Sequence, residues 1–171
     1  MGFINIEIKA RTTRAAEIRK YLQENGAAFI GTDHQADTYF NVTNGRLKLR
    51  EGKIENNLIF YSRAETGGTK QSNVEMMQVA DPPVLRNILA KAMGVLAVVN
   101  KRREIYYIDN VKFHLDTLEG LGEFVEIEAC DRFEHIPVER LKEQCEEYMK
   151  LFGVKEEDLV KKSYSDMVME L

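Results

Sequence analysis

The chain has 171 residues, of which 44 % are hydrophobic and 30 % are charged, a composition that suits one globular domain spanning residues 1–171. A net charge of −4 and an isoelectric point near 5.5 argue against a general nucleic-acid binder. There is neither an apolar leader nor an apolar run of 18 residues, and the two cysteines, Cys130 and Cys145, show no metal or redox spacing, so we expect a cytoplasmic protein without a membrane partner.

Hydrophobic periodicity and turn residues predict many short strands and a few helices along the chain. The expected strands cover residues 3–11, 27–31, 36–43, 46–51, 57–65, 73–80, 95–109, 111–118 and 123–130, with 95–109 read either as one long strand or as a bent pair. The expected helices cover residues 12–26, 81–93, 137–151 and 164–170. Tight turns such as Asn44-Gly45 join the strands, which favours an α+β fold with an antiparallel sheet, curled or closed, and helices packed outside it.

Local signals support two of these helices and one loop. Ile18 and Leu22 lie four residues apart and predict a buried helical stripe, and Asp81 followed by two prolines predicts a helix start. The segment ETGGTKQS, residues 65–72, reads equally as a plain loop or as a lid that carries Lys70 and Ser72.

Charged residues alternate with apolar ones on several of the expected strands. In NIEIKAR, residues 5–11, Glu7, Lys9 and Arg11 share one face, and in GRLKLRE the alternate residues are all basic. Counted over all strands, the candidates are eight cations and four anions, namely Lys9, Arg11, Arg46, Lys48, Arg50, Arg63, Lys101 and Arg103 with Glu7, Asp116, Glu126 and Glu128. If these faces meet in one cavity, they would suit a polyphosphate bound with Mg²⁺ or Mn²⁺, because those ions prefer oxygen ligands and bridge to phosphates.

The segment NIEIK resembles the Glu-x-Glu-x-Lys signature of the CYTH superfamily, the triphosphate tunnel metalloenzymes. Further similarity runs through QADTYFN, GRLKLRE, VVNKRRE, FHLDTLEGLGEFVEIEA and SYSDM in the same order. The combination of GRLKLRE, LIFYSRA and HLDTLEGLGEFVEIE looks most similar to the class IV adenylyl cyclase branch, and thiamine and inorganic triphosphatases belong to the same superfamily.

This resemblance implies an eight-stranded antiparallel tunnel that binds a nucleoside triphosphate or inorganic triphosphate with a divalent metal. It assigns metal binding to Glu7, Asp116, Glu126 and Glu128, and phosphate binding to Lys9, Lys48, Arg50, Arg63, Lys101 and Arg103. Arg11 and Arg46 join the phosphate-binding candidates because they share strand faces with these residues. Lys9, Arg63 and Asp116 are the candidate catalytic residues, and His114 is expected to be structural rather than a ligand.

One position departs from the signature, because Asn5 stands where its first Glu would be, which removes one carboxylate from the expected metal site. Three functions therefore remain: a class IV adenylyl cyclase-like enzyme that converts ATP to cyclic AMP and pyrophosphate, a triphosphatase acting on tripolyphosphate or on a thiamine or nucleoside triphosphate, and a non-catalytic polyphosphate or nucleotide binder. Neither the general base nor the residues that would recognise a base is indicated, and a homodimer is left open.

Overall fold

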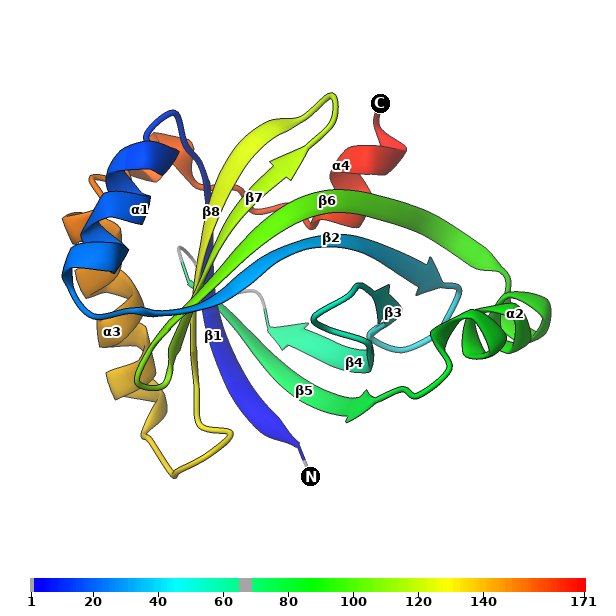
Figure 1. Cartoon of the computed structure of the whole chain (residues 1–171). Helices are drawn as coiled ribbons and strands as arrows, with labels where there is room; N and C mark the ends of the chain where they lie inside the picture. Colours follow the sequence, from blue (N-terminus) through cyan, green and yellow to red (C-terminus); the bar gives the residue numbers. More distant parts are fainter. Residues whose placement is uncertain (1, 65–68) are drawn as a thin grey trace.

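The computed structural model describes residues 2–64 and 69–171, and these residues form eight strands and four α-helices (Figure 1). The strands are β1 (Phe3–Arg11), β2 (Ala28–Phe40), β3 (Arg46–Glu51), β4 (Asn57–Ala64), β5 (Lys70–Gln78), β6 (Val95–Ile108), β7 (Val111–Leu118) and β8 (Gly122–Cys130). The helices are α1 (Ala15–Glu24), α2 (Pro82–Met93), α3 (Val138–Leu151) and α4 (Tyr164–Met169), with a 3-10 turn, η1, at Glu156–Asp158. Within these ranges no helix has the length and hydrophobicity needed to cross a bilayer.

The strands hydrogen-bond in a closed ring, in the order β1-β5-β4-β3-β2-β6-β7-β8, and every pairing is antiparallel. β1 completes the ring because its two edges pair with β5 and β8, so that Glu7 lies opposite both Lys70 and Glu128. Each strand then turns alternate side chains toward the inside of the ring. The predicted eight-stranded antiparallel tunnel with helices outside is confirmed.

The main hydrophobic core lies outside the ring, where α1 and α3 cover the outer faces of β1, β7 and β8 (Figure 1). Ile6, Phe113 and Ile127 point outward from these strands and are fully buried against Leu22 of α1 and Leu141 of α3. Each such side chain stabilises the fold by about 1.5–3 kcal/mol relative to an exposed position. Because the outer faces supply this energy, the inner faces are free to carry charge.

The buried stripe predicted for α1 and the start predicted for α2 are both found in the structure. Ile18 and Leu22 of α1 are buried, as predicted. At the start of α2, the Asp81 side chain accepts a hydrogen bond from the Val84 backbone N–H and prolines occupy the first turn, which satisfies the exposed helix end. No residue of α2 is buried, however, and Ile88 is 56 % exposed, so this helix lies on the surface.

The two strands expected at residues 27–31 and 36–43 form one strand, β2, which corrects the prediction. β2 pairs with β6 from Ala28 opposite Tyr107 to Phe40 opposite Val95. A bulge lies between Phe29 and Gly31, whereas residues 32–35, where the gap was expected, pair with β6 without interruption. Its partner β6 is likewise a single strand, which decides between the two readings of residues 95–109.

The strand expected at residues 73–80 begins earlier, at Lys70, and ends at Gln78. The polar residues Lys70, Gln71 and Ser72 belong to a strand because they pair with Glu7, Ile6 and Asn5 of β1. The first half of the predicted 65–72 loop, residues 65–68, lies outside the described residues, as does the last residue of the strand predicted at 57–65.

Candidate functional site

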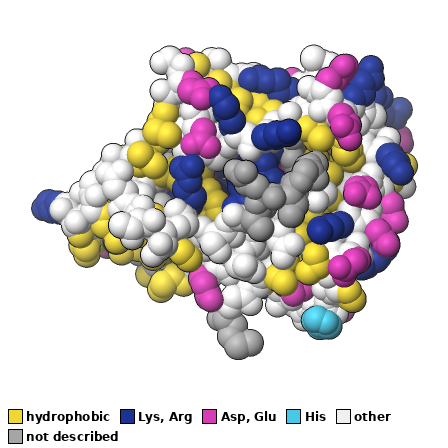
Figure 2. All heavy atoms as spheres, turned by 180° about the vertical axis from the view of Figure 1, so that it is seen from behind, with side chains coloured by type: hydrophobic (Ala, Val, Ile, Leu, Met, Phe, Trp, Pro, Cys, Tyr) yellow, Lys and Arg dark blue, Asp and Glu magenta, His cyan; other side chains and the backbone are white. Residues whose placement is uncertain are grey.

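The inner faces of the strands enclose a cavity of about 140 Å³ with a strong excess of positive charge. Among the described residues, its lining includes eight basic side chains: Lys9, Lys48, Arg50, Arg63, Lys101, Arg103, Lys112 and Arg132. Four carboxylates also line it: Glu7, Glu55, Glu126 and Glu128. Lys and Arg side chains are visible inside the hollow in the space-filling view (Figure 2). An acidic protein thus encloses a basic cavity.

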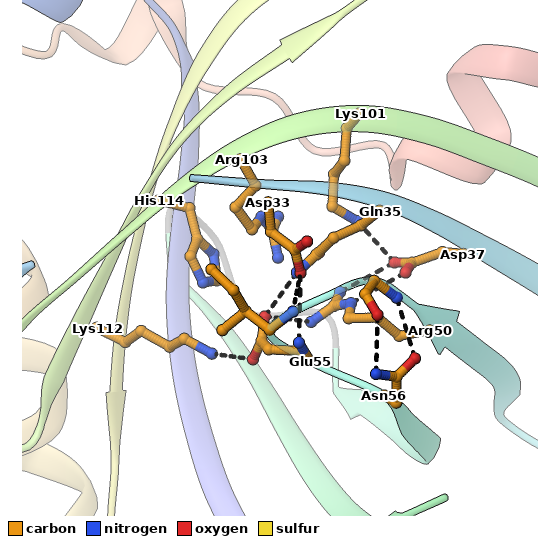
Figure 3. A network of polar contacts seen from close by, with 12 residues as sticks. Asp33, Gln35, Asp37, Arg50, Glu55, Asn56, Lys101, Arg103, Lys112 and His114 are labelled. Atoms are coloured by element: carbon orange, nitrogen blue, oxygen red, sulfur yellow. Dashed lines mark hydrogen bonds and ion pairs between the residues drawn. The ribbon is translucent and has the colours of Figure 1, made fainter. Parts of the chain in front are cut away.

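The first charge cluster of the cavity wall centres on Asp37 of β2 (Figure 3). Arg50 donates two hydrogen bonds of 2.9 Å to its carboxylate, Lys101 donates one of 2.7 Å, and the Lys48 ammonium lies 3.4 Å away. Burial alone would raise the pKa of Asp37, but the charges of Arg50 and Lys101 hold that pKa well below its ordinary value. Asp37 therefore stays ionised and fixes three basic side chains from β3 and β6 in place.

A second cluster centres on Arg103 of β6. Its guanidinium donates to both oxygens of Asp116, at 2.7 and 2.6 Å, and to Glu126 Oε1 at 2.7 Å. The Tyr164 hydroxyl of α4 donates to the same Asp116 carboxylate at 2.8 Å. Asp116 is 1 % exposed and is absent from the cavity lining, so in this structure it orients Arg103 rather than facing the cavity.

A third region, formed by β1, β4 and β5, contains basic groups that are neutralised by fewer neighbouring carboxylates. Arg63 donates to Glu7 at 2.9 Å, whereas the Lys9 ammonium lies over the Tyr164 ring, 3.9 Å from its centre. Burial lowers the pKa of Lys9, and burial with the nearby charge of Lys9 lowers the pKa of Lys70 to about 8. Lys70 Nζ is buried without a hydrogen-bond partner among the described residues. Of these two, only Lys9 lines the cavity, so an anion entering here would compensate the Lys9 ammonium.

Two of the predicted phosphate-binding residues lie elsewhere. Arg11 is exposed and donates to the Leu121 carbonyl at 2.7 Å, and Arg46 forms an ion pair of 3.1 Å with Asp166. Neither is among the residues lining the cavity. The other predicted phosphate-binding residues, Lys9, Lys48, Arg50, Arg63, Lys101 and Arg103, all line it.

The structure also adds residues that the sequence reasoning missed, most clearly Asp37 and Glu55. Glu55 belongs to the loop between β3 and β4, which Asp33 holds by accepting backbone N–H bonds from Lys53, Ile54 and Glu55. Glu55 then accepts a 2.7 Å bond from Lys112 and lies 3.6 Å from Arg50 (Figure 3). The signal for Asp37 was present, because Asp33, Gln35 and Asp37 alternate in DHQADTYF once residues 28–40 are taken as one strand.

Three side chains in the described part of the chain are close enough to share a metal ion. One ligand atom from each of His114, Glu126 and Glu128 lies within 4.8 Å of the others. Burial, together with repulsion from Glu126 and Glu7, raises the pKa of Glu128 to about 7, although the charges of Lys112 and Arg103 oppose this rise. Glu7 and Asp116, the other predicted ligands, are outside this group and pair with Arg63 and Arg103. The donor set fits a divalent cation.

Comparison with known proteins agrees with this architecture. A family model described as the CYTH domain matches residues 4–164, from β1 to the first residue of α4. The chain belongs to the CYTH family. The CYTH match reaches into every strand of the ring and includes every strand residue that lines the cavity except Phe3.

Several individual CYTH-like proteins resemble the chain over nearly its full length. A protein of Methanocaldococcus jannaschii named "Putative adenylate cyclase MJ0240" is 26 % identical, and the alignment covers 96 % of this chain and 98 % of that protein. The PH1012 protein of Pyrococcus horikoshii OT3 has a TM-score of 0.83 at 26 % identity, covering 96 % of this chain and 99 % of that one. HpAC1 from Hippeastrum, described as a "putative adenylyl cyclase" with a dominant triphosphatase activity, shares the fold with a TM-score of 0.63 at 17 % identity, covering 89 % of this chain and 88 % of that one.

Proposed function

We propose that this CYTH protein binds a triphosphate in its tunnel together with Mg²⁺ or Mn²⁺, and that it is a class IV adenylyl cyclase-like enzyme converting ATP to cyclic AMP and pyrophosphate. The observation that carries the proposal is the enclosed excess of basic side chains, since buried cations are costly unless an anion compensates them. The name of the M. jannaschii relative supports the cyclase reading.

The chain's own residues would act mainly by positioning and charge stabilisation, which supply most of the rate in phosphoryl transfer. Arg50, fixed by Asp37, and Arg103, fixed by Asp116, present planar guanidinium groups suited to bidentate phosphate contacts. Lys9, Lys48, Arg63 and Lys101 would complete the clamp. By analogy with the loss of one oxyanion donor, each clamp residue supplies about 2–4 kcal/mol of transition-state stabilisation.

Glu126 and Glu128, with Glu7 beside them on β1, would hold the divalent cation in this proposal. When bound, such an ion neutralises charge that develops on the phosphates. Asn5, which pairs with Cys130 at the edge of this group, offers a neutral oxygen where a carboxylate is expected from the family signature.

Hydrolysis of a triphosphate is the second candidate. The cavity volume of about 140 Å³ is close to that of a cavity that accepts benzene, and is below the roughly 300–1,000 Å³ of sites for drug-sized ligands. A phosphate chain fits this space better than a complete nucleotide does. The triphosphatase activity described for HpAC1 agrees with this alternative, and binding without turnover is the third outcome.

One incubation distinguishes the three. The purified protein is mixed with ATP or tripolyphosphate and either Mg²⁺ or Mn²⁺, and the products are separated. Cyclic AMP with pyrophosphate supports the cyclase, orthophosphate supports the triphosphatase, and binding without product supports the sensor. In the last case Asn5→Glu is tested, because a gain of activity would assign the defect to the metal site.

A matched pair of variants tests whether the cavity is the binding site. Lys9→Met removes an ammonium group that lines the cavity, whereas Arg11→Gln removes a charge from the same strand outside it. We expect Lys9→Met to weaken tripolyphosphate binding and Arg11→Gln to leave it unchanged, measured by titration calorimetry. Equal effects of the two substitutions would show that binding follows overall charge and would refute the proposed site.

A further inference from the structure

His114 on β7 is a buried imidazole whose two nitrogens have no hydrogen-bond partner in the described part of the chain. It is 1 % exposed, and neither Nδ1 nor Nε2 forms a hydrogen bond within the described residues. Leaving a buried polar atom unpaired is costly, and folded proteins rarely do so without a functional reason. The mechanism proposed above does not use this side chain.

The imidazole faces two carboxylates of β8. Its Nδ1 atom lies 3.5 Å from Glu128 Oε1, which is too long for a good hydrogen bond, and Glu126 pairs with His114 across the β7–β8 register. Ligand atoms that each lie about 2.1 Å from one ion are themselves roughly 3–4 Å apart. The separation therefore suits an ion between these groups better than a direct contact.

The surrounding contacts leave donor capacity for such an ion. Glu128 lies opposite Lys112 in the β7–β8 register but forms no ion pair within 4.0 Å with a Lys or Arg in the described part of the chain, and Arg103 reaches Glu126 only through Oε1. His114 thus adds a nitrogen ligand on β7, beside the β8 carboxylates that the proposed function already assigns to a cation.

We propose that His114, Glu126 and Glu128 together form a site for a divalent first-row transition ion, in which the imidazole selects against Mg²⁺. Mg²⁺ is bound mainly by oxygen ligands, whereas imidazole suits softer ions such as Co²⁺ and Zn²⁺, and sites of this kind bind Mn²⁺ more weakly than Co²⁺. This inference rests on the proposed function in one respect: the ion is taken to be the cation held beside the triphosphate.

The first test compares cation binding by variants of the tag-free protein without substrate. Co²⁺ is titrated by its visible absorption, and Mg²⁺ is added as a competitor. His114→Asn replaces the ring with an oxygen donor, and we expect Co²⁺ binding to weaken at least about tenfold, with a smaller change for Mg²⁺. His34→Asn, which alters an exposed histidine, is the matched control and should leave both affinities unchanged. Equal losses in the two variants, or no loss in His114→Asn, would overturn the proposal.

The second test needs no variant and is therefore independent of any folding defect. Pulsed electron paramagnetic resonance of the Mn²⁺-loaded native protein should show coupling to an imidazole ¹⁴N nucleus. Bound Mn²⁺ without this coupling, or no Mn²⁺ binding, would overturn the site. Tripolyphosphate binding is measured separately, without metal. If tripolyphosphate binds but the nitrogen coupling is absent, the metal site is refuted and the triphosphate site stands. If the coupling is present but tripolyphosphate does not bind, the metal site stands and the proposed function is refuted.

Discussion

Replacing Arg103 with Gln should remove the counter-charge of two buried carboxylates at once. Arg103 is 2 % exposed and holds both Asp116 and Glu126 through hydrogen bonds of 2.6–2.7 Å. Breaking a buried ion pair from one side costs about 3–5 kcal/mol because the remaining charge stays buried. For a chain of this size, that loss corresponds to a melting temperature roughly 6–20 °C lower.

The loss should also depend on pH in a defined direction. Burial already raises the pKa of Asp116 in the native protein against the charge of Arg103, and without Arg103 we expect that pKa to rise further and the pKa of Glu126 to rise above its unfolded value of about 4.3. The folded variant then binds more protons than the unfolded chain, so its stability falls as pH rises, by up to about 1.4 kcal/mol per pH unit for each carboxylate. The variant should therefore be closest to the native protein near pH 5 and furthest from it near pH 8.

Urea unfolding at pH 5, 6, 7 and 8 measures both effects. The matched control is Arg102→Gln, since Arg102 neighbours Arg103 on β6 but is exposed on the outer face. We expect the control to stay close to the native protein at every pH. If Arg103→Gln lost no more stability than Arg102→Gln, or lost the same amount at all four pH values, the reasoning about the buried pair would be wrong.

Three further outcomes are expected. Asp37→Asn should destabilise the free protein by about 3–5 kcal/mol while strengthening tripolyphosphate binding, because Arg50 and Lys101 lose their internal anion. Urea unfolding measures the stability and calorimetry measures the binding. A fall in both stability and affinity would contradict this prediction. Because the pKa of Asp37 is held low, the stability gap to this variant should persist above about pH 3.9 and close only as pH falls through the folded-state pKa. Tripolyphosphate at 100 times its dissociation constant should add about 2.7 kcal/mol, or roughly 5–11 °C in a thermal melt, and no shift would count against binding. Leu141→Ala should cost about 2–5 kcal/mol in urea unfolding without changing tripolyphosphate affinity, since Leu141 lies in the outer core.

Side-chain alternation was enough to predict which strand faces carry the charge. On β3 it assigned Lys48 and Arg50 to one face, and both line the cavity. It could not show where along a strand the cavity ends. Arg11 and Arg46 have the correct parity but occupy terminal positions of β1 and β3, where the side chains meet Leu121 and Asp166 instead. Side-chain alternation shows which side of the sheet a residue faces, whereas the stagger of the strands in the closed ring decides how far along the tunnel it lies.

The partners of the predicted basic residues were harder to identify. Asp37 lies within the strand expected at residues 36–43, but the gap expected at residues 32–35 separated it from Asp33 and Gln35 and hid their alternation. Glu55 lies in a loop, where no periodicity applies, and it enters the cavity only because Asp33 holds the loop backbone. The positions of Asp37 and Glu55 beside the basic residues depend on strand pairing that a single sequence does not specify.

The internal carboxylates determine where an incoming anion would gain most. Arg50 and Arg103 already pair with Asp37 and Asp116, so a phosphate that binds them must share or displace an existing partner. Among the described residues, no ion pair within 4.0 Å holds the Lys9 ammonium, which lines the cavity and lies over the Tyr164 ring, whereas Lys70, buried without a hydrogen bond, is not among the lining residues. We therefore expect a phosphate that reaches Lys9 on β1 to compensate charge without breaking an ion pair, so that the Lys9 side of the tunnel contributes most to binding and the arginine side orients the phosphate.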